Sequence, residues 1–150
     1  MASSFFSAEE QGKLLAAIKE AEKETSGEIR LHVESTCDGE VLDRAAWVFK
    51  KLGMEKTAER NGVLFYLAVQ DRKFAIIGDA GINAKVPEGF WDSISGLLTK
   101  NFKEGKFTEG LSEGIIKAGE QLKAHFPYLK SDVNELPDDI SFEKIEGEKE

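Results

Sequence analysis

The sequence predicts an α/β fold: a three-layer α/β/α sandwich with a Rossmann-like mixed sheet, a central hairpin and about four helices. The first observation is the apolar run Val63–Val69, which is rich in β-branched and aromatic residues and too short for a typical helix. The second is the polar turn at 70–73, after which Phe74–Ile77 returns as another buried strand. The third is that helical patterns flank this hairpin, because strands that are apolar on both faces need a layer on each side.

Capping and periodicity define the elements that precede the hairpin. Ser7 followed by Glu10 is a capping box, and the apolar stripe after it predicts a helix that ends near 25–27. From Glu28 to Glu34 apolar and polar residues alternate, which predicts a half-buried strand with one wetter face. A second helix is predicted over about 40–52. A strand, a helix and then the hairpin favour a right-handed βαβ crossover.

Two further helices are predicted after the hairpin. Pro87 precedes the first, whose apolar residues recur at helical spacing until Gly105 ends it. Thr108 is expected to cap the second, which stops at Pro127. That second helix carries a stripe of small residues, where another backbone can approach closely: Gly110, Gly114 and Ala118.

Length and charge suggest how the chain is divided. The 150 residues fit a single domain, which is expected to cover residues 5–130. Residues 131–150 contain eight acidic and two basic residues, so most of the net charge of −8 lies there. This segment is predicted to be an acidic C-terminal tail that docks only in part and costs little stability when removed. The remaining body is nearly neutral, which argues against nucleic acid as a partner.

The cysteine count and the apolar runs indicate the compartment. Cys37 is the only cysteine, so an internal disulfide is excluded and a reducing environment is expected. The first residues lack the positive flank and the apolar run of a secretory signal. The longest apolar run, at 63–69, is too short to span a bilayer. We therefore expect a cytoplasmic protein without a transmembrane segment.

One end of the predicted sheet concentrates the candidate site residues. If the hairpin returns antiparallel, the segment Gly78–Gly81 comes to lie beside Arg60 and Asn61. Gly78 and Gly81 permit positive φ and exposed amides, and Arg60 can hold an oxyanion such as phosphate. Asp79 and Asn61 offer oxygen ligands for a cation. The alternative interpretation is that both segments are turn chemistry alone.

Other chemistries find less support in the sequence. Cys37 as a nucleophile would need a base nearby, and His32 falls on the opposite side of a continued strand. Two separated histidines and one cysteine argue against a conventional zinc site. The sequence contains no glycine-rich nucleotide-binding loop and no nucleophile elbow.

Four short segments, taken in order and spacing, resemble the TPM domain family. They are Thr-Ser-Gly-Glu-Ile-Arg at 25–30, Asn-Gly-Val-Leu at 61–64, Asp-Arg-Lys at 71–73 and the glycine-rich turn at 78–81. The likeness covers roughly residues 5–127 and is greater to the small, free-standing bacterial branch. It implies an α/β/α sandwich and a phosphatase-like activity, and some members are linked to calcium or to membrane-protein maturation or repair.

The resemblance also implies a cation site after the third strand. Many members have Gly-x-Gly-x-Glu there and an Asp shortly afterwards, whereas this chain has Asn83 at the Glu position and Glu88 as the next acid. A calcium or magnesium ion would then be held by Asp79 and Glu88.

Two functions remain open from the sequence. The first is a non-catalytic binding or adaptor module that holds a protein partner through this edge or through the acidic tail. The alternative is a metal-dependent, phosphatase-like hydrolase of phosphomonoesters, with Asp79 and Glu88 at the cation and Arg60 at the phosphate. The first is favoured, because neither a nucleophile nor a matched acid–base pair is identifiable and a fold alone confers no chemistry.

Overall fold

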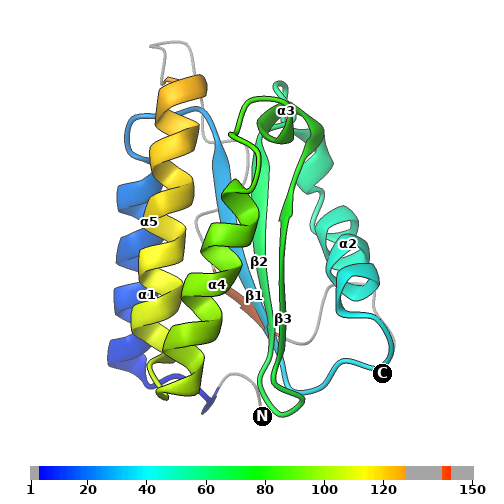
Figure 1. The fold of residues 1–150 in the computed structure, drawn as a ribbon, viewed down its shortest axis with the longest axis vertical. Helices are drawn as coiled ribbons and strands as arrows, with labels where there is room; N and C mark the ends of the chain where they lie inside the picture. Colours follow the sequence, from blue (N-terminus) through cyan, green and yellow to red (C-terminus); the bar gives the residue numbers. More distant parts are fainter. Residues whose placement is uncertain (1–3, 128–139, 143–150) are drawn as a thin grey trace.

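The computed structural model describes residues 4–127 and 140–142, which form a mixed α/β fold with a four-stranded open sheet and five helices (Figure 1). The strands are β1 (Glu28–Glu34), β2 (Gly62–Ala68), β3 (Lys73–Gly78) and β4 (Ile140–Phe142). The helices are α1 (Ala8–Glu22), α2 (Val41–Lys51), α3 (Ala80–Asn83), α4 (Phe90–Lys103) and α5 (Phe107–His125), with a short 3-10 helix, η2 (Met54–Lys56). None of the described helices is long and apolar enough to cross a membrane.

The sheet has the order β3-β2-β1-β4 and contains both parallel and antiparallel pairs. β1 and β2 are parallel over their whole length, from Glu28 opposite Gly62 to Glu34 opposite Ala68. β2 and β3 form the predicted antiparallel hairpin. The hairpin is not at the centre of the sheet, however, because β1 and β2 are the inner strands and β3 lies at an edge.

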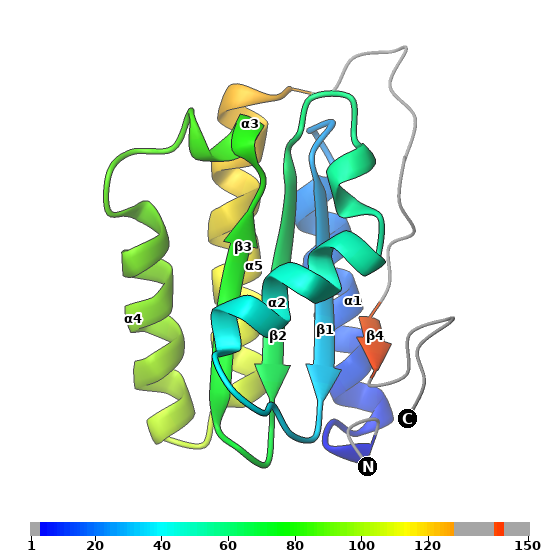
Figure 2. The ribbon, with the colours of Figure 1, turned by 90° about the vertical axis from the view of Figure 1, so that its right-hand side faces the viewer.

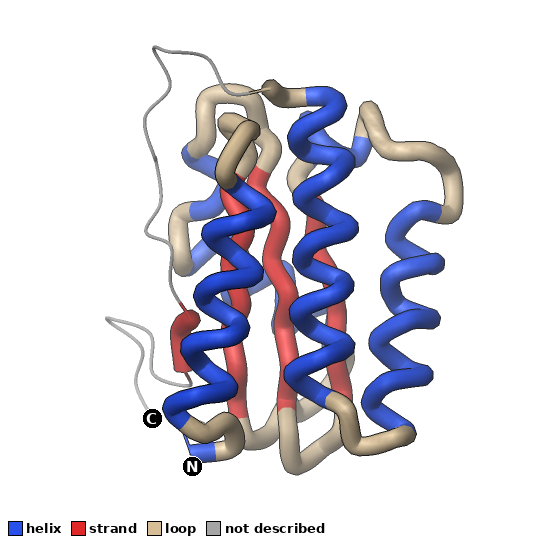
Figure 3. Tube along the Cα trace, turned by 90° about the vertical axis from the view of Figure 1, so that its left-hand side faces the viewer, coloured by secondary structure: helices blue, strands red, loops and turns tan. Residues whose placement is uncertain are grey.

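Helices lie on both faces of the sheet. α1, α4 and α5 lie together on one face, and α2 lies on the other (Figures 1 and 3). The side chains of β2 alternate between two apolar clusters, as predicted. Val63, Phe65 and Leu67 pack in the cluster with α1, α4 and α5, whereas Leu64, Tyr66 and Ala68 pack in the cluster with α2.

Two predicted burial patterns are wrong. β3 was expected to be as enclosed as β2, but every residue of β3 except Ala75 is half-buried, Ile76 included, because β3 is an edge strand. β1 was expected to have a wetter face, but all seven of its residues are buried. At two of these polar positions the covering element is clear: Arg44 of α2 contacts Glu34, and Ser141 of β4 contacts His32.

The four long helices were predicted, with one correction at the start of α5. Ser7 and Glu10 form the predicted capping box at the start of α1. Thr108 does not cap α5, since the helix begins at Phe107 and the Thr108 hydroxyl donates to a carboxylate oxygen of Glu10 at 3.1 Å. The short elements η2, α3 and β4 were not predicted.

β4 falls within the predicted tail. Most of residues 131–150 lie outside the described residues, but Ile140–Phe142 runs parallel to β1 at the edge of the sheet (Figure 2). Ile140 is 6% exposed and belongs to the main apolar cluster. This part of the segment is therefore a strand of the domain.

Candidate functional site

The strand order brings most of the sequence-predicted site residues to one end of the sheet. The backbone N–H of Asp79 donates to the carbonyl oxygen of Gly62 at 2.9 Å, and that of Gly81 donates to Arg60 at 2.8 Å. Gly78 lies opposite Val63 in the hairpin. We call Arg60, Asn61 and the turn Gly78–Gly81 the Arg60 edge.

Arg60 and Asp79 form a two-pronged ion pair at this edge. The guanidinium Nε and Nη2 donate to the two carboxylate oxygens of Asp79 at 2.7 and 2.8 Å. Asp79 also accepts from the N–H of Ala80 at 2.8 Å and so caps α3. The Asp79 side chain is 6% exposed and that of Arg60 is 52% exposed, so the Arg60 guanidinium covers the Asp79 carboxylate. Such paired geometry fixes orientation as well as adding stability.

The backbone at Arg60 is held in an uncommon conformation. Its φ is +52°, in the left-handed region that non-glycine residues seldom adopt. Its carbonyl oxygen accepts from both Gly81 and Ile82, at 2.8 and 3.3 Å. A side chain at Gly81 would overlap the Glu59 carbonyl oxygen and lie 2.6 Å from that of Arg60. The absence of a side chain at Gly81 therefore allows the Gly78–Gly81 turn to pack closely against the backbone of Glu59 and Arg60.

Asn61 carries an unpaired acceptor at the same edge. The residue is 1% exposed. Its backbone N–H donates to the Thr57 hydroxyl at 3.2 Å, and its side-chain Nδ2 donates to Ser26 Oγ at 3.2 Å. Its Oδ1 has no hydrogen-bond partner among the described residues. Buried polar atoms are nearly always paired, so this oxygen is a potential ligand atom.

An aromatic side chain adjoins the Gly78–Gly81 turn. Trp91 donates from Nε1 to the side-chain oxygen of Asn83 at 2.8 Å, and Asn83 Nδ2 donates to the Gly78 carbonyl at 2.7 Å. The Trp91 ring fills the space where a Gly78 side chain would lie. Asn83, which stands where many family members have Glu, is thus a structural link between the turn and α4.

The residues present fit a divalent cation poorly. The Asp79 carboxylate already forms an ion pair with Arg60, and Glu88 lies exposed in the segment before α4. Among the described residues, no group of three or more His, Cys, Asp or Glu side chains is arranged to hold a metal ion. A guanidinium repels a cation, so the Arg60 edge is better suited to an anion.

Sequence reasoning missed a second polar cluster, on the α2 side of the sheet. Arg44 Nε donates to both carboxylate oxygens of Glu34, at 3.1 and 3.0 Å, and Nη2 donates to one of them. The Tyr66 hydroxyl donates to the other oxygen, and His32 Nε2 lies 3.2 Å from the first. We call Glu34, Arg44, Tyr66 and His32 the Glu34 cluster.

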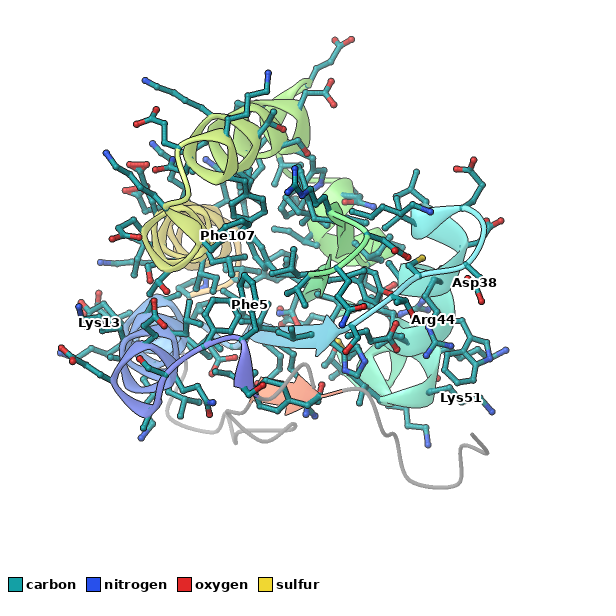
Figure 4. All side chains as sticks on the ribbon, turned by 90° about the horizontal axis from the view of Figure 1, so that it is seen from below. Phe5, Lys13, Asp38, Arg44, Lys51 and Phe107 are labelled. Carbon is teal, nitrogen blue, oxygen red and sulfur yellow. The ribbon has the colours of Figure 1, made fainter. Side chains whose placement is uncertain are left out.

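The Glu34 cluster is buried, and its environment shifts the pKa of Tyr66. Glu34, His32 and Tyr66 are each at most 3% exposed. Burial raises the pKa of the Tyr66 hydroxyl, and its hydrogen bond to Glu34 raises the pKa further. Only Arg44 reaches the surface, where its guanidinium lies 4.4 Å from the centre of the Trp47 ring. Figure 4 shows Arg44 on α2, with Lys51 farther along the same helix.

The alternation in β1 was the signal for this cluster. Tyr66 lies opposite His32 in the parallel register, so acid, base and hydroxyl meet on one face of two adjacent strands. The sequence shows the alternation but does not show that α2 covers it.

The fold is similar to several solved structures of bacterial proteins. The BA42 protein from the psychrophilic bacterium Bizionia argentinensis is 48% identical, with a TM-score of 0.86, and the match covers 93% of this chain and 97% of that chain. The N-terminal domain of the cg2496 protein from Corynebacterium glutamicum is 13% identical, with a TM-score of 0.63, over 92% of this chain and 81% of that chain. An N-terminal domain from P. gingivalis is 20% identical, with a TM-score of 0.66, over 83% and 80%.

The last two similarities show the fold alone. A comparison with curated proteins gave no match. The family model of the TPM domain matches residues 2–121, in agreement with the resemblance found in the sequence. The chain therefore belongs to the TPM domain family.

Proposed function

We propose that this TPM domain is a non-catalytic module that binds a protein partner through the Arg60 edge. The observation that supports this proposal is the two-pronged ion pair between Arg60 and Asp79. A general base or a cation ligand needs a free carboxylate oxygen. Both carboxylate oxygens of Asp79 already accept hydrogen bonds from Arg60, and one of them also accepts a hydrogen bond from the backbone N–H of Ala80. This arrangement suits a rigid binding surface better than a reaction centre.

The exposed groups of this edge favour a partner of particular chemistry. Arg60 uses Nε and Nη2 for Asp79, and within the described residues its Nη1 carries no hydrogen bond. Trp91 is half-buried beside the same turn. Arginine and tryptophan are over-represented among the residues that dominate protein–protein binding energies. The partner would place a carboxylate at Arg60 and apolar side chains beside Trp91.

A phosphatase-like hydrolase of phosphomonoesters is the second candidate. It is favoured by the buried, unpaired Oδ1 of Asn61 and by the half-exposed Arg60, which is suited to a phosphate group. A calcium or magnesium ion would require Arg60 to leave Asp79. A phosphate bound between the two charges would reduce this conflict.

The proposal includes a reducing, cytoplasmic location in a bacterial cell. It rests on the single cysteine, Cys37, which is buried and free. A free, buried thiol is compatible with a reducing compartment, in which disulfides do not form.

The two functions are distinguished by turnover of a generic phosphomonoester, measured with and without calcium or magnesium. We expect no turnover above the rate given by Asp79→Asn in the same buffers. A working enzyme at a typical rate of about 1–10³ s⁻¹ would be readily detected. Turnover that needs the metal and is lost in Asp79→Asn would reject the binding module and establish the hydrolase.

Partner binding is tested by affinity capture from a bacterial lysate on immobilised chain. A specific partner should be retained by wild type and by Trp47→Ala on the α2 face, but lost with Arg60→Gln. Thermal melting of each variant shows whether the fold is intact. Equal retention by wild type and Arg60→Gln would rule out this edge as the binding surface.

A further inference from the structure

The outer side of α2 carries an exposed aromatic ring between two cations. Trp47 is 36% exposed, and the Arg44 guanidinium carbon lies 4.4 Å from the centre of its ring. The Lys51 ammonium nitrogen lies 5.5 Å from the same centre. Residues three and four positions apart lie on one side of a helix, so these side chains form a continuous surface. We call Arg44, Trp47 and Lys51 the Trp47 flank.

One end of the Trp47 flank lies beside the end of β4. Arg44 donates to the carboxylate of Glu34, the last residue of β1. β4 runs parallel to β1 and ends with Phe142 opposite Val33, one residue before Glu34. The chain therefore leaves β4 next to the carboxylate that Arg44 holds. Residues 143–150, which continue from this point, lie outside the described residues.

The sequence that follows β4 complements the Trp47 flank in charge and in apolar character. Residues 143–150 read Glu-Lys-Ile-Glu-Gly-Glu-Lys-Glu, with four acidic and two basic side chains. α2 instead has three basic side chains and one acidic side chain. The segment also contains one large apolar side chain, Ile145, and the exposed ring of Trp47 offers an apolar surface for it to cover.

The spacing of the acids also matches that of the cations. Arg44 and Lys51 are seven positions apart, which is about 10 Å along a helix. An extended chain covers about 10 Å in three positions, and Glu143 and Glu146 are three positions apart. An extended segment can therefore place one acid near each cation.

We propose that residues 143–150 dock on the Trp47 flank of the same chain, with the two acids near Arg44 and Lys51 and with Ile145 against the Trp47 ring. Each exposed ion pair contributes little by itself. Because the segment continues directly from β4, however, its local concentration at the flank is typically millimolar, and weak contacts are then enough to hold it. This surface goes beyond the Arg60 edge and does not depend on it.

The test compares the full-length chain, labelled with nitrogen-15, with a chain that stops after residue 142 and so keeps β4. The measured quantity is the difference between the two chains in the chemical shift of the Trp47 indole Nε1–H. We expect a clear difference at Trp47 and none at Trp91, which lies at the Arg60 edge and serves as the internal reference. Sodium chloride at about 0.5 M should reduce the difference at Trp47, because salt screens exposed charges.

Charge exchange tests the pairing of Glu146 with Lys51. Lys51→Glu, made in both chains, should reduce the difference at Trp47 to below about a third, because the segment then meets a repelling charge. Adding Glu146→Lys to the full-length Lys51→Glu chain should restore at least about half of the difference, as expected for residues that interact directly. Lys50→Glu is the matched control, since it changes the net charge equally at a neighbouring position outside the flank and should preserve the difference.

Four results would overturn the proposal. One is the same Trp47 shift in the full-length and shortened chains. A second is an equal reduction by Lys50→Glu and Lys51→Glu, which would indicate a general effect of charge. A third is the absence of any recovery on charge exchange. The fourth is a Trp47 difference that grows with protein concentration, which would place the segment of one copy on α2 of another.

Discussion

Glu34 lies in an environment very different from that of a solvated side chain. Burial acts to raise the pKa of its carboxyl group, but hydrogen bonds from His32, Arg44 and Tyr66 outweigh that effect and lower the pKa to about 2, from 4.5. The charged form of Glu34 is therefore stabilised by the fold, and the Glu34 cluster connects β1, β2 and α2 electrostatically.

This lowering of the pKa makes folding stability depend on pH. A carboxyl group with a depressed pKa stabilises the fold fully above its unfolded value of 4.5 and loses that contribution as pH falls toward 2. The difference corresponds to about 3 kcal/mol. We expect Glu34→Gln to destabilise the protein at pH 7 and to flatten the loss of stability between pH 4.5 and 2. Urea unfolding across this pH range measures both effects.

Glu24→Gln is the matched control for that experiment. Glu24 pairs with Lys123 at the surface, where both side chains are more than half exposed. Solvent screens such a pair, so its removal should leave the pH profile nearly unchanged. If Glu34→Gln follows the same profile as Glu24→Gln, the Glu34 cluster does not hold the carboxylate in its charged form.

Strand order alone was enough to predict which residues meet at the Arg60 edge. Once the hairpin was recognised, the antiparallel return placed Gly78–Gly81 beside Arg60. The sequence did not reveal that the Asp79 carboxylate pairs with the Arg60 guanidinium. Such a side-chain pairing depends on rotamers and burial, which a sequence pattern does not encode. The Glu34 cluster was missed for a related reason, since Arg44 comes from a helix whose covering role becomes visible only in three dimensions.

At the scale of elements, β2 and β3 differ in how much they contribute to stability. Phe65 on β2 is 1% exposed, whereas Ile76 beside it on β3 is half-buried. Phe65→Ala should cost about 3–5 kcal/mol, as for other enclosed phenylalanines. Ile76→Ala should cost less than half as much, because an edge position leaves a smaller cavity. Chemical denaturation of the two variants and wild type gives the comparison.

Equal losses of stability in these two variants would show that β3 is as enclosed as β2. A Phe65→Ala variant as stable as a surface mutant would show that helices do not cover both faces of the hairpin. Either outcome contradicts the structure.

Long elements were predicted well and short ones were not. α1, α2, α4 and α5 have enough turns for an apolar stripe to show, and β1 and β2 have clear alternating or continuous apolar runs. α3 has four residues and β4 has three, which is too few for any periodicity. Both are specified instead by contacts with distant residues, Asp79 with Arg60 and Ser141 with His32.

For the molecule as a whole, the C-terminal boundary of the domain is testable by truncation. Charge alone predicted that removing residues from 131 onward costs little, but β4 buries Ile140 and supplies the partner of His32. A chain that stops after residue 139 should lose roughly 3 kcal/mol, from the apolar area and the unpaired ring nitrogen. A chain that stops after residue 142 keeps β4 and should be close to wild type.

Thermal and urea unfolding of the two truncated chains measure that difference. Because they differ by only three residues, general effects of shortening the chain are nearly the same in both. If both are as stable as wild type, β4 adds nothing to the domain and the boundary predicted near residue 130 is right.

The pairing of β4 with β1 has a consequence for biosynthesis. His32 and Ser141 are 109 positions apart in the chain, so this contact is among the last that can form. Synthesis at about 5–20 residues per second leaves the edge of β1 without β4 for roughly 5–20 s after β1 is made. Unpaired strand edges invite wrong association, and charged residues within a strand discourage it. We therefore expect the charges of Glu28, Arg30 and Glu34 to disfavour such association during this interval, before they become buried in the finished sheet.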